Sequence, residues 1–161
     1  MAHTGEQPVS ALRSLRSDEA TFVKFVNRTL RNARPWWINF DGIPQSYADI
    51  PPGGVLHMRT YRTHPWVFRD ADTGDKLLIK NDEIYFPTSK QYDEDGPTYI
   101  PVDVTIPVYS LKNCCLQRIR KHMKSDDYTK LELPKSLHTD LKNSPDLLRA
   151  IENLSKVYRN N

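Results

Sequence analysis

From residue 21 to residue 108 the chain alternates apolar and polar positions with the period of a β-strand. Residues 21–27 place Thr21, Val23 and Phe25 on one face, which predicts a half-buried strand. Turn sequences rich in Gly, Pro, Asn and Asp separate this strand from further short runs. Those runs are PWWINF at 35–40, VLHMRTY at 55–61, PWVFRD at 65–70, KLLIKN at 76–81 and EIYF at 83–86. Short strands with such regular turns predict a β-sandwich.

The run at 35–40 carries two adjacent tryptophans. Trp36, Ile38 and Phe40 are two residues apart, so a strand would place them on one face. Trp37 would then point to the opposite face, because successive side chains of a strand alternate. An outward Trp favours a contact surface or a covered edge.

The last strand-like run, IPVDVTIPV at 100–108, alternates without interruption. Because a proline cannot donate to a β-ladder, Pro101 and Pro107 require an edge strand or ladder positions without a hydrogen bond. The apolar side chains predicted to share one side are Ile100, Val102, Val104, Ile106 and Val108.

After residue 108 the apolar period lengthens to that of a helix. Leu111, Cys115, Ile119 and Met123 recur every fourth residue, and Ser110 precedes them as a natural N-cap. The pattern predicts an amphipathic helix of about three turns.

Two more short helices are predicted towards the end of the chain. Pro134 suits the first position of a helix that carries Leu137 and Leu141 on one face. Ser144 and Pro145 mark the start of the last helix. Its apolar face is predicted to consist of Leu147, Ile151, Leu154 and Tyr158. The fold class is therefore α+β, with a β-sandwich domain followed by a small three-helix region. The helices between residues 110 and 143 can bury little area against each other, so part of their apolar surface should contact the β domain or another protein.

Composition adds limits to this picture. The 161 residues suit one domain with a small appendage, and 38% hydrophobic content with twelve prolines predicts conspicuous loops. Residues 1–107 hold 12 Lys and Arg against 14 Asp and Glu, whereas residues 108–161 hold 11 against 6. The basic residues of the second half are dispersed along polar helix faces, which favours a solvated surface over a nucleic-acid site.

Catalytic and metal-binding motifs are not found in the sequence. The only two cysteines, Cys114 and Cys115, are adjacent, so they cannot form an ordinary disulfide with each other. Helical spacing puts them on different faces, which makes them a poor chelate for one metal. The sequence has no apolar run of membrane-spanning length and no signal-peptide pattern. We therefore expect a soluble intracellular protein without cofactor or metal.

One stretch, TYRTHPW at 60–66, gathers candidate binding groups. A hydroxyl from Thr60 and the His64 imidazole could converge there on one ligand atom, with Tyr61 and Trp66 as aromatic walls. The alternative is a hairpin corner with ordinary core aromatics, and the spacing does not separate the two. Tyr47, in the loop QSYADIPPGG, is likewise either a contact residue or a packed loop residue.

Three segments, taken in order, resemble one known family. WWINFDGIPQSYADIPPG, YRTHPWVFRDA and TIPVYSLKNCCLQRIR closely resemble the von Hippel–Lindau family, and the similarity runs from about Leu12 to about Arg159. The sequence itself suggests a disordered N-terminus at 1–11. The resemblance implies a β-sandwich substrate-binding domain at 12–107 and a small α domain at 108–143. It also implies that the final helix, at 144–159, packs back on the sandwich.

The family is the substrate-recognition subunit of a cullin-RING ubiquitin ligase, so the resemblance implies a non-catalytic adaptor. Its expected partners are elongin C, elongin B and a cullin with its RING subunit, and its expected localisation is cytoplasmic and nuclear. The elongin-binding box falls by resemblance on Ser110, Leu111, Cys115, Leu116, Ile119 and Arg120, with Cys114 in a variable slot. The cullin box falls on Leu133, Pro134 and Leu137.

The β domain of the family binds the degron of hypoxia-inducible factor alpha subunits after a proline has been hydroxylated. Aromatic rings would wall the pyrrolidine ring, while Thr60 and His64 would hydrogen-bond its added hydroxyl. Unmodified proline would leave both polar groups without partners, which is the physical basis of selectivity. By resemblance the pocket falls on Trp37, Tyr47, Thr60, Tyr61, His64 and Trp66.

The sequence also departs from the family pattern. Thr60 stands where Ser is usual, which adds a methyl group and a stiffer χ1, and Ala48 stands where Pro is usual. Positions near Arg16 and Asp18 differ as well, which bears on contacts with the ends of a peptide.

Two other functions therefore remain as alternatives: a β-sandwich binding or structural module that acts outside the ligase, and an RNA-binding protein that uses the basic second half. Instability without elongins would favour the adaptor, and steep salt dependence of RNA affinity would favour the RNA-binding protein.

Overall fold

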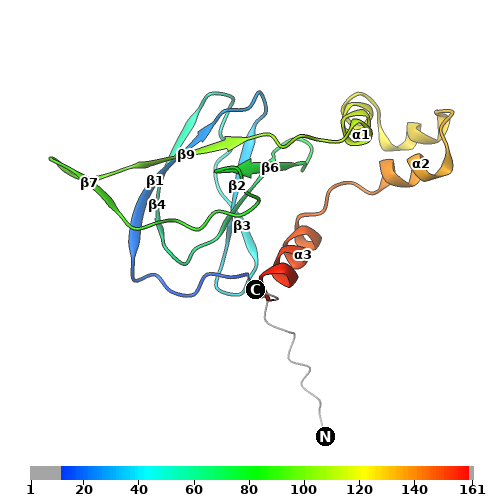
Figure 1. The fold of residues 1–161 in the computed structure, drawn as a ribbon. Helices are drawn as coiled ribbons and strands as arrows, with labels where there is room; N and C mark the ends of the chain where they lie inside the picture. Colours follow the sequence, from blue (N-terminus) through cyan, green and yellow to red (C-terminus); the bar gives the residue numbers. More distant parts are fainter. Residues whose placement is uncertain (1–11, 160–161) are drawn as a thin grey trace, which may run out of the picture.

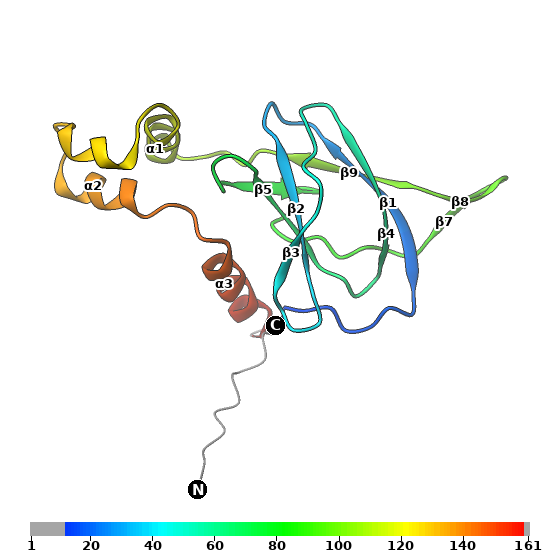
Figure 2. The ribbon, with the colours of Figure 1, turned by 180° about the vertical axis from the view of Figure 1, so that it is seen from behind.

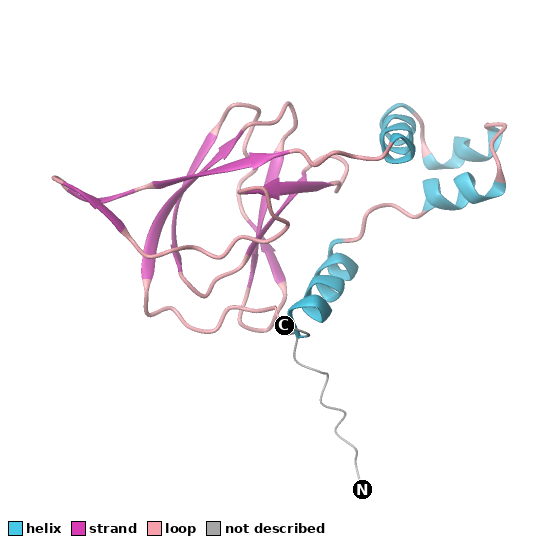
Figure 3. Ribbon diagram, viewed as in Figure 1, coloured by secondary structure: helices cyan, strands magenta, loops and turns pink. Residues whose placement is uncertain are grey.

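A computed structural model describes residues 12–159, in which a curled β domain is followed by helices (Figures 1 and 3). The strands are β1 (Ala20–Asn27), β2 (Ala33–Ile38), β3 (Pro44–Ser46), β4 (Val55–Tyr61), β5 (Trp66–Asp70), β6 (Lys76–Ile79), β7 (Gln91–Asp93), β8 (Gly96–Thr98) and β9 (Ile100–Thr105). The helices are α1 (Leu111–His122), the 3₁₀-helix η1 (Ser125–Lys130), α2 (Lys135–Lys142) and α3 (Leu147–Arg159). The predicted α+β class is confirmed; η1 lies where a break between helices was expected.

Seven strands form one sheet in the order β3-β2-β5-β6-β9-β1-β4. The sheet curls, so that β3, β2 and β5 lie on one side and β9, β1 and β4 on the other (Figure 2). Side chains from both halves meet in one core, which includes Val23 and Phe25 of β1, Phe68 of β5 and Val104 of β9. The two halves of this curled sheet form the predicted sandwich.

Strand β1 follows its sequence pattern closely. Thr21, Val23 and Phe25 are all buried on the inner face. The run EIYF at 83–86 does not form a strand, so the prediction for these residues is wrong. Only an isolated bridge forms there, in which the backbone of Tyr85 exchanges two 2.9 Å hydrogen bonds with Trp66.

Strand β9 ends earlier than the alternation suggested. It pairs with β1 over residues 100–104 but with β6 only at Val104 and Thr105. Pro101 therefore lies in a part of the strand with a neighbour on one side only, where the missing N–H is tolerated. Beyond Thr105 the chain leaves the sheet, so Ile106 and Val108 are exposed rather than part of the predicted apolar face.

Strand β2 is covered on both faces. Trp37 packs against the main core, whereas Trp36 and Ile38 join a second cluster that includes Ile151 of α3. Phe40 does not continue this face as expected. The strand ends at Ile38, and the ring of Phe40 packs edge-on against Trp37 instead, with 5.8 Å between ring centroids.

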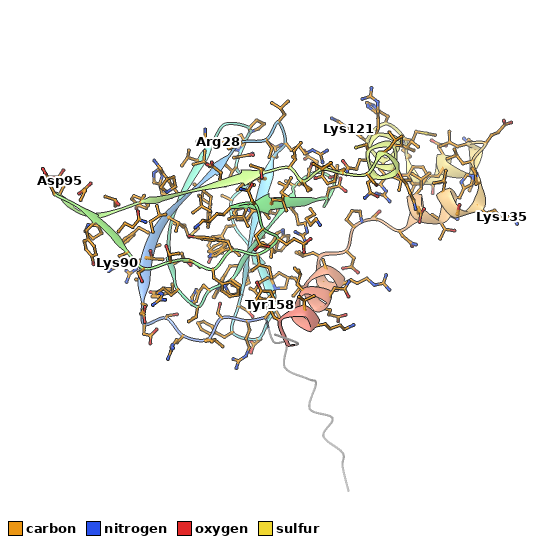
Figure 4. All side chains as sticks on the ribbon, in the orientation of Figure 1. Arg28, Lys90, Asp95, Lys121, Lys135 and Tyr158 are labelled. Carbon is orange, nitrogen blue, oxygen red and sulfur yellow. The ribbon has the colours of Figure 1, made fainter. Side chains whose placement is uncertain are left out.

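An unpredicted hairpin, β7–β8, projects away from the main sheet (Figure 1). Its turn carries Glu94 and Asp95, directly after Asp93 at the end of β7, and Asp95 lies at the far tip while Lys90 lies near the base (Figure 4). The strands are only three residues long each, too short to show a clear period in the sequence.

Helix α1 begins where the sequence indicated. Ser110 is the N-cap, and its hydroxyl accepts a hydrogen bond from the Asn113 backbone N–H at 3.1 Å. Helix α2 begins at Lys135, one residue later than predicted. Pro134 is its N-cap residue and not its first helical residue. A small cluster of Leu116, Tyr128 and Leu141 joins α1, η1 and α2.

Helix α3 begins at Leu147, three residues later than predicted. Asp146 rather than Ser144 caps it, because Asp146 Oδ1 accepts from the Leu148 backbone N–H at 3.1 Å. The predicted face is confirmed: Ile151 is buried against the β domain, flanked by Leu147 and Leu154. Tyr158, near the end of the helix (Figure 4), packs against Phe86 of the β domain. The last helix thus packs back on the sheet.

The contact between the β domain and α1 is polar. Arg31 Nη1 lies 3.2 Å from Asp70 Oδ2 and 3.6 Å from Asp75 Oδ2, and Arg31 Nη2 donates to Gln117 Oε1 at 2.7 Å. The guanidinium also lies over the Tyr109 ring, and burial raises the pKa of Tyr109 to about 12. We call Arg31, Asp70, Asp75 and Gln117 the interdomain network.

Candidate functional site

The six predicted pocket residues come together where the curled sheet fails to close. Strands β3 and β4 are the two edges of the sheet; Tyr47 directly follows β3, and Thr60 and Tyr61 end β4. His64 lies in the turn between β4 and β5, while Trp66 of β5 pairs with Trp37 of β2. These side chains span the gap between the edges.

Thr60 and Trp66 are the most deeply buried of these six residues. Both are almost fully buried, and the Trp66 Nε1–H donates to Thr60 Oγ1 at 3.0 Å. Tyr47 packs against the Trp66 ring with 5.1 Å between centroids, and its own ring stays partly exposed. Because Thr60 Oγ1 accepts from Trp66, its own O–H is available to donate to a ligand.

His64 is held by aromatic rings on several sides. Its imidazole stacks on Trp37 at 5.1 Å between centroids, while Phe40 and Tyr61 pack against it at 5.4 Å and 4.9 Å. Burial lowers the pKa of His64, and the hydrogen bond to the Arg16 carbonyl opposes that shift. A neutral imidazole is therefore favoured at neutral pH.

The N-terminal segment fixes which nitrogen of His64 carries the proton. His64 Nε2 lies 3.1 Å from the Arg16 carbonyl oxygen and 3.2 Å from Ser17 Oγ. Because a carbonyl oxygen only accepts hydrogen bonds, the bond to Arg16 places the proton on Nε2. Nδ1 of the neutral ring is then an acceptor.

A second contact of the same segment positions Trp37. Ser14 is fully buried; its hydroxyl accepts from Trp37 Nε1 at 2.8 Å and donates to the Ile38 carbonyl at 2.6 Å. We call residues 14–17 the strap. Sequence reasoning missed the strap and Phe40 as parts of this site. Ser14 and Ser17 lie 23 and 47 residues from their partners, and no local pattern indicates such contacts.

The helical region presents a different kind of surface. Leu111 is 81% exposed on the first turn of α1, and Cys115, one turn later, is exposed too. Ile119 of the same predicted stripe is partly buried in the cluster of Leu116 and Tyr128. We call Leu111 and Cys115 the α1 docking face. Leu111 and Cys115 are one helical turn apart and therefore adjoin, which makes them a candidate contact surface for a partner.

Two residues of the predicted elongin-binding box face inwards instead. Leu116 is buried in the helical cluster. Arg120 Nη2 donates to the backbone carbonyl of Asn143 at 3.2 Å, and its Nε donates to that of Leu141 at 3.3 Å. Arg120 thus binds carbonyl groups at the end of α2. Both residues hold α1 and α2 together in the free chain.

The three predicted cullin-box residues lie together before and within α2. Leu133 and Leu137 are half-buried, and Pro134 between them is exposed. Leu133 packs at the margin of the helical cluster.

A further cleft of about 850 Å³ lies between α1 and the β domain, with Arg31, Asp70 and Cys114 among its lining residues. Within residues 12–159, no cluster of three or more His, Cys, Asp or Glu side chains suited to a metal was found, and no helix there has the length and apolarity to cross a membrane.

The fold and these two surfaces define a two-part protein: a β domain that gathers Thr60 and His64 among aromatic rings, and a helical region that exposes Leu111 and Cys115. Comparison with known proteins agrees with this division. A family model described as the VHL beta domain matches residues 12–93, and one described as the VHL box domain matches residues 109–157. The chain belongs to the VHL family.

A curated relative supports the same assignment. Protein Vhl of Drosophila melanogaster is 28% identical over 102 residues, which make up 59% of this chain and 57% of the fly protein. The match therefore spans little more than half the length of that relative.

Proposed function

We propose that this protein is the substrate-recognition adaptor of an elongin B/C-cullin-RING ubiquitin ligase. It would bind prolyl-hydroxylated degrons of hypoxia-inducible factor alpha subunits and present them for ubiquitination, without catalysing the transfer itself. Membership of the VHL family supports the adaptor role. The substrate half is supported by two polar side chains held among the aromatic rings: Thr60, whose hydroxyl accepts from Trp66, and His64, whose Nε2 is bonded to the Arg16 carbonyl. Such an adaptor would work in the cytoplasm and nucleus.

The pocket chemistry suits one added hydroxyl. The O–H of Thr60 would donate a hydrogen bond to the ligand's hydroxyl oxygen. Nδ1 of His64 would accept a hydrogen bond from the ligand's O–H. The rings of Trp37, Tyr47 and Trp66 would surround the pyrrolidine ring, in keeping with their packing around the two polar groups. A hydroxyproline would therefore use one donor and one acceptor that plain proline leaves unpaired.

The position of the pocket suits an extended peptide. Strand β4, which carries Thr60 and Tyr61, is an edge strand of the sheet. A peptide can align with such an edge through backbone hydrogen bonds, while a pocket reads one of its side chains. The proline of the degron would then enter beside Thr60.

Binding of matched degron peptides with hydroxyproline or proline tests the substrate half. Leaving a buried donor or acceptor unpaired costs about 1–3 kcal/mol for each group. For two such groups we expect the hydroxylated peptide to bind at least about 30-fold more tightly by titration calorimetry. Equal affinities would refute hydroxyproline recognition.

The scaffold half assigns partners to the helical region. Leu111 and Cys115 would enter a groove of elongin C as the apolar stripe of a helix, a recognised mode of helix binding. Leu133, Pro134 and Leu137 would contact the cullin.

Purification of the chain co-expressed with elongins B and C and a cullin tests these assignments. A Pro134→Asp variant should lose the cullin and keep the elongins, because Pro134 is exposed and lies outside α1. A chain that binds the hydroxylated peptide but neither elongins nor cullin would instead be a β-sandwich binding module that acts outside the ligase.

A further inference from the structure

The unexplained polar group nearest to the pocket is the hydroxyl of Thr21. Thr21 is fully buried on the inner face of β1. Among the described residues 12–159, its Oγ1 is one of two buried side-chain atoms without a hydrogen-bond partner. Burying a hydroxyl without a partner opposes folding, so an atom of this kind calls for a reason.

Thr21 lies directly beside a pocket residue. In the antiparallel pairing of β1 with β4, Thr21 is the cross-strand partner of Thr60. Both side chains are buried on the inner face, which continues through Val23 and Met58. The Cβ atoms of such a pair are about 4.5–5.5 Å apart, and threonines at this separation can hydrogen-bond across strands after a change in χ1.

The hydrogen-bonding capacity of the two threonines is complementary. Thr60 Oγ1 has two lone pairs; the Trp66 Nε1–H occupies one of them at 3.0 Å. If the Thr60 O–H donates to a ligand, its second lone pair still lacks a donor. Thr21 supplies a donor without an acceptor on the neighbouring strand.

We propose that Thr21 is a positioning residue for recognition of the hydroxylated ligand, a role that rests on the proposed function. In the bound state the Thr21 O–H donates to the second lone pair of Thr60 Oγ1. With both lone pairs occupied, by Trp66 and Thr21, the Thr60 O–H has only one direction left, towards the ligand. A chain of hydrogen bonds of this kind also strengthens its members.

The test is a Thr21→Val variant of the full chain, because valine keeps the shape and β-branching and removes only the hydroxyl. Affinities are measured for synthetic degron peptides that differ only in 4-hydroxyproline or proline. We expect the preference for the hydroxylated peptide to fall about fivefold, the factor for one ordinary hydrogen bond. The affinity for the proline peptide should not change, and the Tm should stay the same or rise, since an unpaired buried hydroxyl is lost. An undiminished preference would overturn the proposal.

A matched control is Thr29→Val, which removes a buried hydroxyl that already has a partner. Thr29 Oγ1 donates to Asn27 Oδ1 at 2.7 Å. This variant should lower the Tm and leave the hydroxyl preference unchanged. If Thr21→Val does not fold, Thr21→Ser and Thr21→Ala repeat the comparison. Serine should then keep the preference that alanine loses, and equal preferences would overturn the proposal.

The result also separates this inference from the proposed function. A wild-type chain that does not distinguish the two peptides refutes hydroxyproline recognition, and the role of Thr21 with it. A wild-type chain that distinguishes them as strongly as Thr21→Val refutes the role of Thr21 alone.

Discussion

The pocket of the β domain and the α1 docking face differ in how complete they are in the free chain. In the pocket, Trp66, Trp37 and His64 each have a hydrogen-bond partner within the chain. On the docking face, Leu111 and Cys115 extend into solvent. The side chains of Trp66, Trp37 and His64 are thus held in place by the chain itself, whereas the helical region exposes apolar surface that is unfavourable in water.

The reason for the difference is the size of each core. The β domain buries a cluster that spans β1, β2, β5, β6 and β9, while the helical region buries only Leu116, Tyr128 and Leu141 as its own cluster. A cluster of three residues cannot cover both faces of α1. Ligand recognition should therefore be a local property of the β domain, and the stability of the helical region should depend on its partner.

The largest effect should come from a charge on the docking face. Leu111→Asp should reduce elongin C affinity at least about a hundredfold, because a carboxylate would have to be desolvated in an apolar groove. Affinity capture with elongins B and C measures the loss, while hydroxylated-peptide binding should persist. Leu148→Asp is the control, since Leu148 is also an exposed leucine, 61% accessible, but lies on α3. Equal losses for the two variants would contradict a specific docking face.

The next effect concerns the pocket. Thr60→Val should weaken hydroxylated-peptide binding by about 10- to 100-fold, since it removes a ligand donor. It should also lower the free energy of unfolding, because the buried Trp66 Nε1–H loses its acceptor. Thr60→Ser keeps the hydroxyl and should bind about as tightly as the wild type. Calorimetry and thermal unfolding measure both quantities, and a Thr60→Val chain with full affinity would exclude Thr60 from recognition.

A smaller effect should follow from cutting the interdomain network. Arg31→Ala leaves the buried carboxylates of Asp70 and Asp75 without their cation. We expect the free energy of unfolding to fall by about 2 kcal/mol. This is less than for a fully buried ion pair, because Arg31 is partly exposed. Arg34→Ala is the control. Its ion pair with Asp49 has good geometry, with 2.8 Å between Nε and Oδ1, but is solvent-exposed, so its loss should cost less than about 1 kcal/mol. Urea unfolding distinguishes the two.

The pH dependence of peptide binding should be modest and have a definite sign. Burial holds the pKa of His64 below its ordinary value of about 6.5. In the proposed function the ligand needs the neutral ring, so affinity should be constant above that value and fall as the pH drops through the pKa of the free protein. Titrations from about pH 7.5 to about pH 5 test this. His122→Gln, a change at an exposed histidine of α1, should leave the profile unaltered, and a loss of affinity that begins above pH 6.5 would contradict the assignment.

The smallest effect is expected at Cys114, in contrast to its neighbour Cys115. Cys114→Ser should leave elongin binding unchanged, because Cys114 lies off the docking face and lines the cleft near Arg31 and Asp70. Cys115→Phe should abolish binding, since a small apolar thiol is replaced by a ring that collides with the partner. Similar losses in affinity capture would mean that both thiols face elongin C.

Local patterns in the sequence predicted much of the fold. Thr21, Val23 and Phe25 carry a period that one buried face requires, and Ser110 provides an N-cap with a local partner. The prediction failed where tertiary contacts decide. Residues 83–86 have the composition of a strand, yet only Tyr85 meets a backbone partner, and Val108 continues a period after the chain has left the sheet.

The site was predicted in the same uneven way. His64 and Trp66 stand close together in the sequence, so their convergence with Thr60 could be proposed from spacing. The strap could not be proposed, because Ser14 and Ser17 are common surface residues and their partners lie far along the chain. The sequence also could not show that Leu116 and Arg120 face inwards, since helical spacing alone does not say which side α2 covers.

The oxygen of Thr60 has a consequence for which sequences this fold can tolerate. That one atom accepts from Trp66 inside the core and, in the proposed function, contacts the ligand as well. A mutational scan for folded protein and a scan for peptide binding should therefore reject the same apolar replacements at residue 60. Serine and threonine should pass both. Random variation at residue 60 would then seldom produce a stable chain that no longer binds its ligand. Random variation at Leu111, by contrast, should often produce a stable chain that no longer binds its partner.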